Sequence, residues 1–462
     1  MTGGELERLA LGCLLPGFPG EEPPDWIRRL LDAGLGGVVL YAWNVRDQTQ
    51  LRALTDALRA ERPELVVAID EEGGDVTRLE ARAGSSYPGN RALGVVDDVE
   101  LTRAVAGAMA ADLAAAGINL DLAPVADVNT TADNPIIGVR SFGSDAELVA
   151  RHVAAFVEGL EAGGVAACAK HFPGHGDTLE DSHLELPTVD ELRAEALLPF
   201  RAAIDAGVTA IMTAHIRVRE IGDEPATLSA ALLGDVLRDD LGFTGVAITD
   251  ALEMKAISGT VGVEQGAVQA LVAGADALCL GHDLGADSVE RIVAAVVEGV
   301  SEERLVEAAS RVAGIGRARA AVDAPNRGVG AAAAARAVRT EGQVRLTRPA
   351  VVVELRPEPT IAVDARNGGL GDALAARVPG TRIAHESTAA ASDGQLVVVI
   401  QDAHRHEWQR NAATKLVGAS SDAIVVEVGL PVWRPSAAAG YVATHGAAKV
   451  NVEAAVDRLL GA

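Results

Sequence analysis

Short apolar runs alternate with longer amphipathic stretches over roughly the first 320 residues. Each run is continuously apolar, which is typical of strands that are buried on both faces of a parallel sheet. The eight runs are Leu9–Leu15, Gly37–Tyr41, Leu65–Ile69, Ile118–Leu122, Val165–Ala169, Ala210–Thr213, Val246–Thr249 and Ala277–Leu280. Between them the clearest helical patterns are Thr49–Ala60, Glu100–Ala116, Ala146–Glu161, Val189–Ala206 and Ser229–Leu241.

Eight strand–helix units predict an α/β fold, a (β/α)8 barrel of the TIM type. An open doubly wound sheet is the alternative, but no Gly-x-Gly-x-x-Gly turn follows the first run. We therefore expect a catalytic barrel over residues 1–322.

A smaller pattern follows an Ala/Arg-rich connection. Its apolar runs are Val351–Leu355, Thr360–Val363, Leu396–Ile400 and Ile424–Val428, and its helical stretches are Gly371–Val378, Trp408–Val417 and Val450–Leu460. Four strands with few helices predict a C-terminal α/β sandwich domain over residues 349–462, joined to the barrel by a linker at residues 323–348.

Composition narrows the choice of partner and compartment. A formal net charge of −25 argues against nucleic acid or an anionic membrane as a partner. Cys13, Cys168 and Cys279 have no metal-like spacing and lie in apolar runs, so we expect buried thiols in a reducing compartment. We find neither a secretory signal pattern nor an apolar stretch long enough to span a membrane, and we expect a cytoplasmic protein.

Charged and imidazole side chains follow several predicted strands directly. In a barrel of parallel strands these positions share the C-terminal face, where such enzymes build their active sites. The residues are Asp70, Glu71, Glu72 and Arg78 after the third run, Asp127, Asn129 and Arg140 after the fourth, His215 after the sixth, Asp250 after the seventh, and His282 and Asp283 after the eighth. We therefore expect an active site on this face.

The segment from Lys170 to His183 follows the fifth run and carries three histidines, a lysine and two aspartates. One proline and two glycines exclude a helix, so we expect a loop. A metal site is one hypothesis, because His171 and His175 have the spacing of zinc ligands. Zinc ligands at that spacing usually share one face of a helix. Because this segment cannot be helical, the spacing argues against a metal site. Phosphate binding is a weaker hypothesis, because there is no P-loop sequence.

Acid–base and nucleophilic chemistry on a sugar is the third hypothesis. A retaining glycosidase needs a carboxylate beside the anomeric carbon and a proton donor near the leaving oxygen. Asp250, at the end of a buried strand, is placed to supply the carboxylate. Asp181 and His183 point the same way in an extended segment, so Asp181 can stabilise a protonated His183. The side chains suited to holding polar groups of a sugar are Lys170, Arg78, Arg140 and Asp70.

Five motifs give the chain a specific resemblance. They are Asp70-x-Glu-Gly-Gly-x-Val-x-Arg78, Arg140-Ser-Phe-Gly, Lys170-His-Phe-Pro-Gly-His-Gly-Asp-Thr with Asp181-Ser-His183, Met212-Thr-Ala-His215 and Thr249-Asp250-Ala-Leu-x-Met254. The set resembles the bacterial β-N-acetylglucosaminidases of glycoside hydrolase family 3 and covers the whole predicted barrel. The C-terminal part resembles the smaller domain of the two-domain members.

The resemblance implies a role for each residue. Asp250 would be the nucleophile that forms a glycosyl-enzyme intermediate with retention. His183, assisted by Asp181, would be the acid/base on a loop that closes over the substrate. The residues that bind the terminal N-acetylglucosamine would be Asp70, Arg78, Arg140, Lys170 and His171. His215 would form a wall of the site and His175 would shape the loop. Neither a metal ion nor another cofactor is implied.

The function implied is removal of terminal N-acetylglucosamine from small glycosides, in particular cell-wall muropeptide fragments. A histidine acid/base leaves an alternative open, because an imidazole does not repel an incoming anion as a second carboxylate would. Some relatives with this arrangement use phosphate in place of water, so the chain could be a β-N-acetylglucosaminide phosphorylase. Hypotheses of other classes are a non-catalytic sugar-binding protein and a metal-dependent hydrolase.

Overall fold

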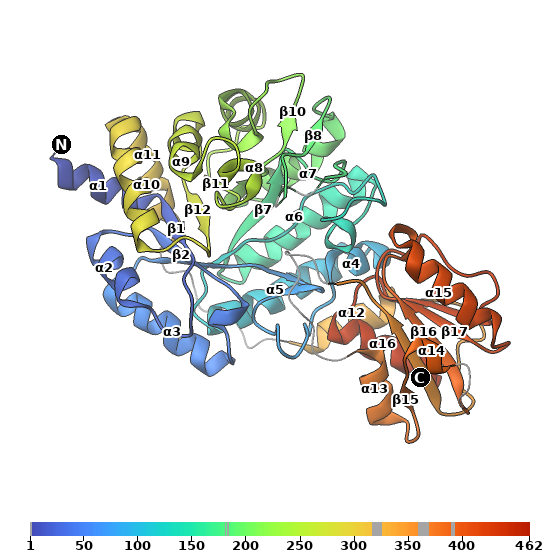
Figure 1. The fold of residues 1–462 in the computed structure, drawn as a ribbon. Helices are drawn as coiled ribbons and strands as arrows, with labels where there is room; N and C mark the ends of the chain where they lie inside the picture. The colour runs from blue at the N-terminus through green and yellow to red at the C-terminus, as the bar shows by residue number, and fades with distance from the viewer. Residues whose placement is uncertain (1, 181, 183, 317–325, 359–368, 390–392) are drawn as a thin grey trace. The chain divides into compact units, whose positions relative to one another are not determined.

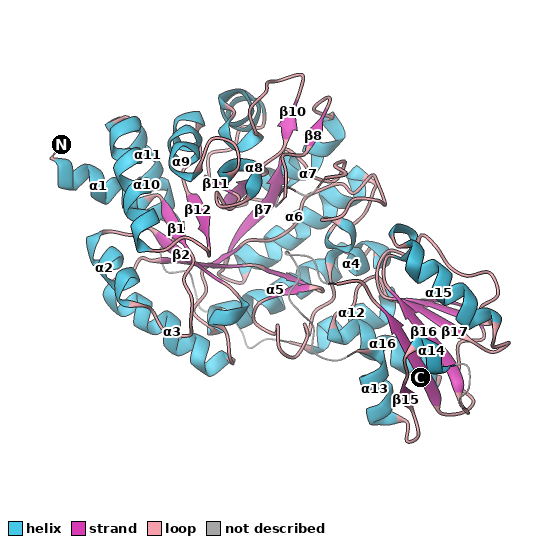
Figure 2. Ribbon diagram, viewed as in Figure 1, coloured by secondary structure: helices cyan, strands magenta, loops and turns pink. Residues whose placement is uncertain are grey.

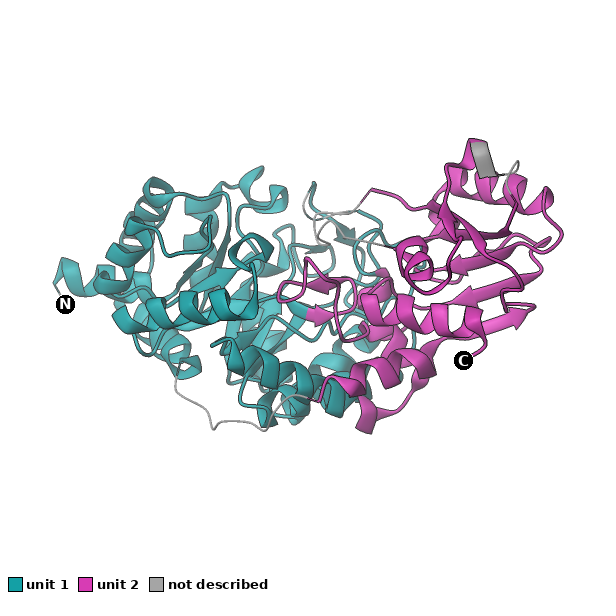
Figure 3. Cartoon of the chain, turned by 90° about the horizontal axis from the view of Figure 1, so that it is seen from below, with its two compact units in different colours: residues 1–71, 102–137, 144–325 teal, residues 72–101, 138–143, 326–462 magenta. Residues whose placement is uncertain are grey.

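The computed structural model of the chain describes residues 2–180, 182, 184–316, 326–358, 369–389 and 393–462. The chain forms two compact units, each assembled from several stretches of the sequence (Figure 3). Unit 1 comprises Met1–Glu71, Thr102–Ile137 and Ser144–Pro325, and unit 2 comprises Glu72–Leu101, Gly138–Gly143 and Asn326–Ala462.

Unit 1 is an α/β fold with a curled parallel sheet (Figures 1 and 2). The six-stranded part has the order β11–β9–β7–β6–β3–β2. These strands are β2 (Gly37–Leu40), β3 (Val66–Ile69), β6 (Leu120–Asp121), β7 (Ala166–Phe172), β9 (Ala210–Thr213) and β11 (Val246–Thr249). A parallel pair, β1 (Leu14–Pro16) and β12 (Leu278–Gly281), is bridged to β11 between Ile248 and Ala277. Each of the eight apolar runs overlaps a strand, and the first of them does so only at its end.

Small and β-branched side chains fill the interior of the curled sheet. Alternate strand positions, such as Val66 with Ala68, lie in one buried cluster together with Cys168 and Cys279. Close packing of such small groups lets a chain with 3% aromatic residues build a dense core. The three cysteines are free and buried, as predicted.

Helices connect the strands of unit 1 and lie outside its sheet (Figure 2). They are α1 (Gly3–Gly12), α2 (Asp25–Ala33), α3 (Gln48–Glu61), α5 (Val99–Ala115), α6 (Ala146–Ala162), α7 (Ala194–Asp205), the π-helical η4 (Ala231–Asp240), α8 (Lys255–Ser258), α9 (Val263–Ala273), α10 (Ala286–Gly299) and α11 (Glu302–Ile315). Several begin at a side-chain cap: Asp47, Asp145 and Ser301 accept backbone N–H groups at the starts of α3, α6 and α11. The short elements are η1 (Ala42–Asn44), η3 (Ala226–Leu228), β8 (Thr188–Val189) and β10 (Arg217–Val218).

Unit 2 contains a six-stranded sheet in the order β13–β18–β17–β16–β14–β15. Its strands are β13 (Arg339–Gly342), β14 (Ala350–Leu355), β15 (Arg382–Ile383), β16 (Gln395–Ile400), β17 (Ile424–Glu427) and β18 (Gly440–Ala443). β13 pairs antiparallel with β18, and the other pairs are parallel. The helices and short elements from residue 326 onward are α12 (Gly328–Ala337), α13 (Leu370–Arg377), α14 (Glu386–Ala389), η5 (Ala403–Arg405), α15 (Glu407–Gly418) and α16 (Lys449–Leu460).

Both faces of this second sheet are apolar. Val397 and Val399 of β16 lie in a cluster with Leu459 of α16. Val398 of the same strand faces the other way and clusters with Leu416 of α15. A strand covered on both faces has no polar face, which explains why β16 appears as a continuous apolar run.

The stretch 72–101 forms part of unit 2, together with η2 (Gly138–Arg140). It carries β4 (Glu71–Gly73), β5 (Val76–Thr77) and α4 (Asn90–Val96), which packs against α12. Arg336 forms an ion pair of 2.8 Å with Asp98, and Arg339 donates to the carbonyl of Val95 at 2.9 Å. Residues distant in the sequence therefore form one packed body.

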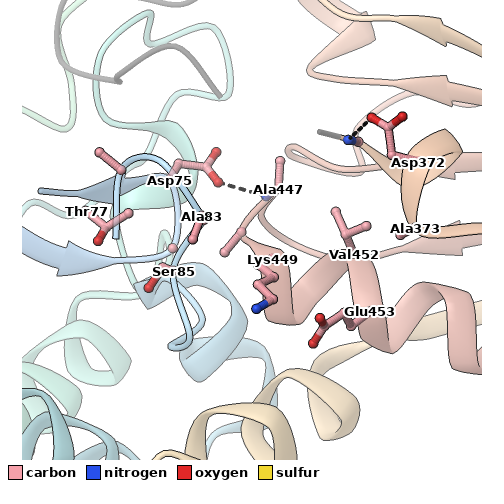
Figure 4. A pocket seen from close by; sticks show the side chains of 15 residues that line it. Asp75, Thr77, Ala83, Ser85, Asp372, Ala373, Ala447, Lys449, Val452 and Glu453 are labelled. Atoms are coloured by element: carbon pink, nitrogen blue, oxygen red, sulfur yellow. Dashed lines mark hydrogen bonds between the residues drawn. The ribbon is translucent and has the colours of Figure 1, made fainter. Parts of the chain in front are cut away.

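A cavity of about 230 Å³ lies in unit 2 between this stretch and α16 (Figure 4). The side chains of Asp75 and Thr77 line one side, and those of Lys449 and Glu453 line the other. Next to it, the carboxylate of Asp75 accepts the backbone N–H of Ala447 at 2.8 Å. This bond ties the stretch 72–101 to the segment that starts α16.

The first apolar run needs correction, because Leu9–Leu15 is not one strand. α1 continues to Gly12, and the strand begins at Leu14. The reason lies at the start of the chain, where the backbone N–H of Thr2 donates to the Glu5 carboxylate at 2.7 Å. Thr and Glu at this spacing form a capping box, which starts a helix.

Two further expectations change. β7 runs through Phe172, so Lys170 and His171 end a strand instead of starting a loop. The expected linker 323–348 contains α12 and β13, while the predicted run Thr360–Val363 lies outside the described residues. The domain boundaries at residues 322 and 349 stay a prediction. In the part of the chain that the structure describes, no helix is long and apolar enough to cross a bilayer.

Candidate active site

The carboxyl ends of the strands in unit 1 carry the predicted site residues. Asp70 follows β3, Lys170 and His171 end β7, and Asp250 follows β11. His215 lies two residues beyond β9. Because these strands are parallel and neighbouring, their carboxyl ends lie along one edge of the curled sheet. The predicted clustering on one face therefore holds for these five residues.

Lys170 is paired with Asp70. The Nζ atom lies 2.6 Å from Asp70 Oδ1, and the lysine side chain is 2% exposed. A buried ammonium loses its hydration and needs such a partner to remain charged. The pair places one donor group and one acceptor group at the ends of β7 and β3, which is an arrangement suited to binding sugar hydroxyls.

His171 is fixed by a buried aspartate. Its Nδ1 lies 2.8 Å from Asp127 Oδ2. The other oxygen of Asp127 accepts the backbone N–H groups of His171, at 3.3 Å, and His175, at 2.6 Å. The carboxylate holds the Nδ1 proton and leaves Nε2 as the atom that can face a ligand.

His175 is held inside the protein. Its Nδ1 lies 2.6 Å from the Thr178 hydroxyl, and its Nε2 lies 3.2 Å from the Ser182 hydroxyl. Burial lowers the pKa of His175 to about 4, so the ring is neutral near pH 7. These bonds are those of a residue that shapes the loop. Asp181 and His183, which flank Ser182, lie outside the described residues.

Asp250 begins the loop after β11. Its backbone N–H donates to the carbonyl of Thr213 at 3.2 Å, and its Oδ1 accepts the N–H of Ala251 at 2.7 Å. His215 contacts the residue that follows Asp250. Its Nδ1 lies 2.8 Å from the Thr227 hydroxyl, and its Nε2 lies 3.0 Å from the carbonyl of Ala251. Both ring nitrogens of His215 thus contact the protein, which favours a role in positioning the residue next to Asp250.

Burial favours the uncharged form of two titratable groups in the interior beneath this site. Burial, together with the nearby carboxylates of Asp250 and Asp70, raises the pKa of Cys279 to about 12. Burial also raises the pKa of Asp121 well above its usual range. The thiol therefore stays protonated and is a poor nucleophile.

Arg78 and Arg140 belong to unit 2. Arg140 forms a two-pronged ion pair with Glu72, with Nε–Oε2 and Nη2–Oε1 distances of 2.9 and 2.8 Å. The backbone carbonyl of Arg140 accepts from the side chain of Asn90 at 2.8 Å. Arg78 is 7% exposed. Both guanidinium groups are therefore held inside unit 2, whereas the other described site residues are held inside unit 1.

The supporting roles of Asp127 and Asp121 were not predicted. Asp127 was recognised only as a polar residue after a strand, although it holds two histidine residues. Asp121 lies within β6, and its Oδ1 accepts the N–H of Glu71 at 3.0 Å. The available signal for Asp121 was a carboxyl group inside an otherwise apolar run, because burying such a polar group is costly unless it is hydrogen-bonded.

Comparisons with known proteins agree with this geometry. Residues 21–315 match the model of the glycosyl hydrolase family 3 N-terminal domain. The chain is 39% identical over 261 residues to a β-hexosaminidase of Neisseria meningitidis serogroup C, covering 54% of the chain and 72% of that relative. It is 37% identical over 281 residues to β-hexosaminidase A of Pseudoalteromonas piscicida, covering 55% of the chain and 47%, or about half, of that longer protein.

A solved structure extends the likeness to nearly the whole chain, and a second one covers two thirds of it. A glycoside hydrolase family 3 β-N-acetylglucosaminidase from Paenibacillus sp. strain FPU-7 superposes with a TM-score of 0.88 at 31% identity, covering 99% of this chain and 96% of that one. A β-N-acetylhexosaminidase from Beutenbergia cavernae gives a TM-score of 0.62 at 31% identity and covers 67% of this chain and 98% of that one.

Proposed function

Because the chain belongs to glycoside hydrolase family 3, we propose that it is a retaining exo-β-N-acetylglucosaminidase. The family that the five motifs predicted, and with it the class of glycoside hydrolase, is confirmed. The substrates would be small glycosides with a terminal N-acetylglucosamine, including cell-wall muropeptide fragments in the cytoplasm. Relatives named β-hexosaminidase and a solved β-N-acetylglucosaminidase support the choice of sugar.

The observation that carries the proposal is a carboxylate, Asp250, at the same strand edge as the Lys170–Asp70 pair. In the proposed reaction Asp250 attacks the anomeric carbon, and the bond to the leaving oxygen breaks with proton donation from His183. Water, deprotonated by the same histidine, then cleaves the glycosyl-aspartate and restores the starting configuration. Asp181 would stabilise the protonated imidazole.

Binding of the terminal sugar is assigned to the polar groups around Asp250. The paired Asp70 and Lys170 would hold hydroxyls, and Nε2 of His171 would add a third contact. Arg78 and Arg140 are added to the proposed set on the family resemblance of their motifs. We also propose that the curled sheet closes as a (β/α)8 barrel, which the β1–β12 pair and the bridge from Ile248 to Ala277 support.

The Asp250→Asn variant tests the proposal. We expect it to lose at least about a thousandfold in kcat on 4-nitrophenyl N-acetyl-β-glucosaminide, because an amide is a poor nucleophile. Asp239→Asn, the same change at an exposed position of η4, is the control. Near-normal turnover by Asp250→Asn would show that the nucleophile is another residue.

Product analysis in the same assay identifies the acceptor. We expect free N-acetylglucosamine with and without added inorganic phosphate. A phosphate-dependent sugar 1-phosphate would instead identify a phosphorylase. Sugar binding by calorimetry without any product would favour a non-catalytic protein.

A further inference from the structure

A partly exposed group of aromatic side chains lies at the strand edge of unit 1, and no role has been assigned to it above. Tyr41 and Trp43 follow β2 and stack with ring centroids 4.7 Å apart and planes inclined by 14°. His282 follows β12 and meets both rings edge-on, at 5.3 and 4.7 Å. Trp43 is 41% exposed. We refer to Tyr41, Trp43 and His282 as the aromatic platform.

Hydrogen bonds hold the platform in place. The indole N–H of Trp43 donates to the carbonyl of Phe18 at 3.1 Å. The side chain of Asn44 donates to the same carbonyl at 2.9 Å and accepts the backbone N–H of Tyr41 at 2.8 Å. The polar N–H is occupied in this way and Tyr41 stacks on the ring, so the exposed part of Trp43 is largely apolar ring carbon. Immobilising a large apolar surface in water brings no folding benefit of its own.

The platform is connected to the loop that begins with Asp250. Three residues further along this loop, the Glu253 carboxylate accepts the backbone N–H groups of His282 and Asp283 at 2.8 and 2.7 Å. The N–H of Leu252 donates to the carbonyl of Cys279 at 3.0 Å. The nucleophile loop and the platform loop are therefore joined at neighbouring strand ends.

A polar pair lies next to the exposed ring. Nδ1 of His282 lies 2.7 Å from the carboxylate of Asp283, which is 79% exposed. An aromatic face beside hydrogen-bonding groups matches the chemistry of a pyranose ring. The C–H groups of such a ring carry partial positive charge and are attracted to the negative face of the indole, while its hydroxyls need donors and acceptors at the edge.

We propose that the aromatic platform binds the sugar on the leaving-group side of the scissile bond and so selects glycosides with a sugar aglycone. The inference rests on the proposed function, since it needs Asp250 to act at the anomeric carbon of the preceding sugar. The indole of Trp43 stacks on the second pyranose ring, and the His282–Asp283 pair bonds its hydroxyl or amide groups. The aryl or alkyl group of an artificial substrate cannot use both kinds of contact.

The test compares a sugar aglycone with a minimal one. Wild type, Trp43→Ala, Trp43→Phe and Trp408→Ala are each assayed with N,N′-diacetylchitobiose and with methyl N-acetyl-β-glucosaminide. Trp408 is an exposed tryptophan on α15 of unit 2 and serves as the matched control. For Trp43→Ala we expect kcat/KM to fall about tenfold more on the disaccharide than on the methyl glycoside, a change worth about 1.4 kcal/mol. For Trp43→Phe we expect a smaller fall in kcat/KM on the disaccharide than for Trp43→Ala.

Equal losses on the two substrates, or an unchanged disaccharide rate, would overturn the inference. A wild-type protein that cleaves neither substrate would count against the proposed function. Calorimetry distinguishes a wrong role for the platform from a wrong proposed function, because it measures sugar binding without turnover. Chitobiose should bind Asp250→Asn more tightly than Asp250→Asn/Trp43→Ala, and equal affinities would again overturn the role of the platform.

Discussion

Lys170 shows how a single side chain links stability to the site. It is one of four lysines in the chain, and its charge is buried against Asp70 at 2.6 Å. We expect Lys170→Met to lower the free energy of unfolding by roughly 2–3 kcal/mol, because Asp70 loses its cationic partner. The double variant Asp70→Asn/Lys170→Met should recover part of this loss. Urea unfolding measures both, and a double variant as unstable as the sum of the singles would refute the coupling.

His445 gives a prediction about pH. The residue, in unit 2, is 4% exposed, and neither ring nitrogen has a hydrogen-bonding partner among the described residues. Burial, with help from Arg91 and Arg339, lowers its pKa from 6.5 to about 4. The unfolded chain therefore binds the proton more readily, so stability is retained above about pH 6.5 and lost as the pH falls toward 4.

The matched variant for this effect is His445→Asn. The backbone has φ of 59°, a conformation that asparagine tolerates. We expect wild type to lose on the order of 1–2 kcal/mol more than the variant between pH 7 and pH 5. His175 titrates in both proteins, so the difference isolates His445. Parallel stability curves over this range would show that protonation of His445 is not coupled to unfolding.

Site residues could be predicted from the sequence where a polar side chain lies directly at the end of a predicted strand. Lys170 and Asp250 come directly at the ends of apolar runs, and parallel strands bring those ends together. The role of Asp127 was not predictable in this way. Its partners include backbone N–H groups 44 and 48 residues away in the sequence. A bond to a backbone N–H group does not depend on the partner's side chain, so it leaves no motif in the sequence.

At the scale of elements, the apolar runs located strands buried on both faces but missed polar ones. β13 (Arg339–Gly342) is exposed along its length and pairs with β18 at the edge of the sheet, so it lacks an apolar signal. The end of β7 was missed for a related reason. Lys170 and His171 are polar, and only the pairing with β9 shows that the strand continues to Phe172.

The loops after β6 and β7 touch where Gly176 lies. A Cβ at this glycine would stand 1.9 Å from the backbone carbonyl oxygen of Val128. We expect Gly176→Ala to separate the two loops and to destabilise the protein by about 2 kcal/mol. Activity should fall as well, because Asp127 and His175 are held across the same contact.

Gly234→Ala is the control for this variant. Gly234 lies within η4, and a Cβ there meets nothing within 4 Å. Alanine in a helix interior is favoured over glycine by up to about 1 kcal/mol, so this variant should be neutral or stabilised. Thermal melting and the glycosidase assay compare the two. A Gly176→Ala protein with normal stability and activity would contradict the tight contact.

At the scale of the whole molecule, the order of the sequence and the order of packing differ. The stretch 72–101, which lies within the predicted barrel sequence, is packed into unit 2 with residues from 326 onward. A pattern of apolar runs cannot reveal this, because α4 and α12 are each short and their contact joins positions more than 200 residues apart. A domain boundary drawn along the sequence therefore separates parts that stabilise each other.

This packing predicts the result of removing the C-terminal part. A protein that ends at Pro325 loses α12, Arg336 and the backbone N–H of Ala447, which hold the stretch containing Arg78. We expect kcat/KM on 4-nitrophenyl N-acetyl-β-glucosaminide to fall at least about a hundredfold although Asp250 is retained. Limited proteolysis should cut the shortened protein within residues 72–101. Arg336→Gln in the full chain removes one exposed ion pair, worth at most about 1 kcal/mol, and should leave activity unchanged. A shortened protein with full activity would show that residues 72–101 hold Arg78 in place without their partners in unit 2.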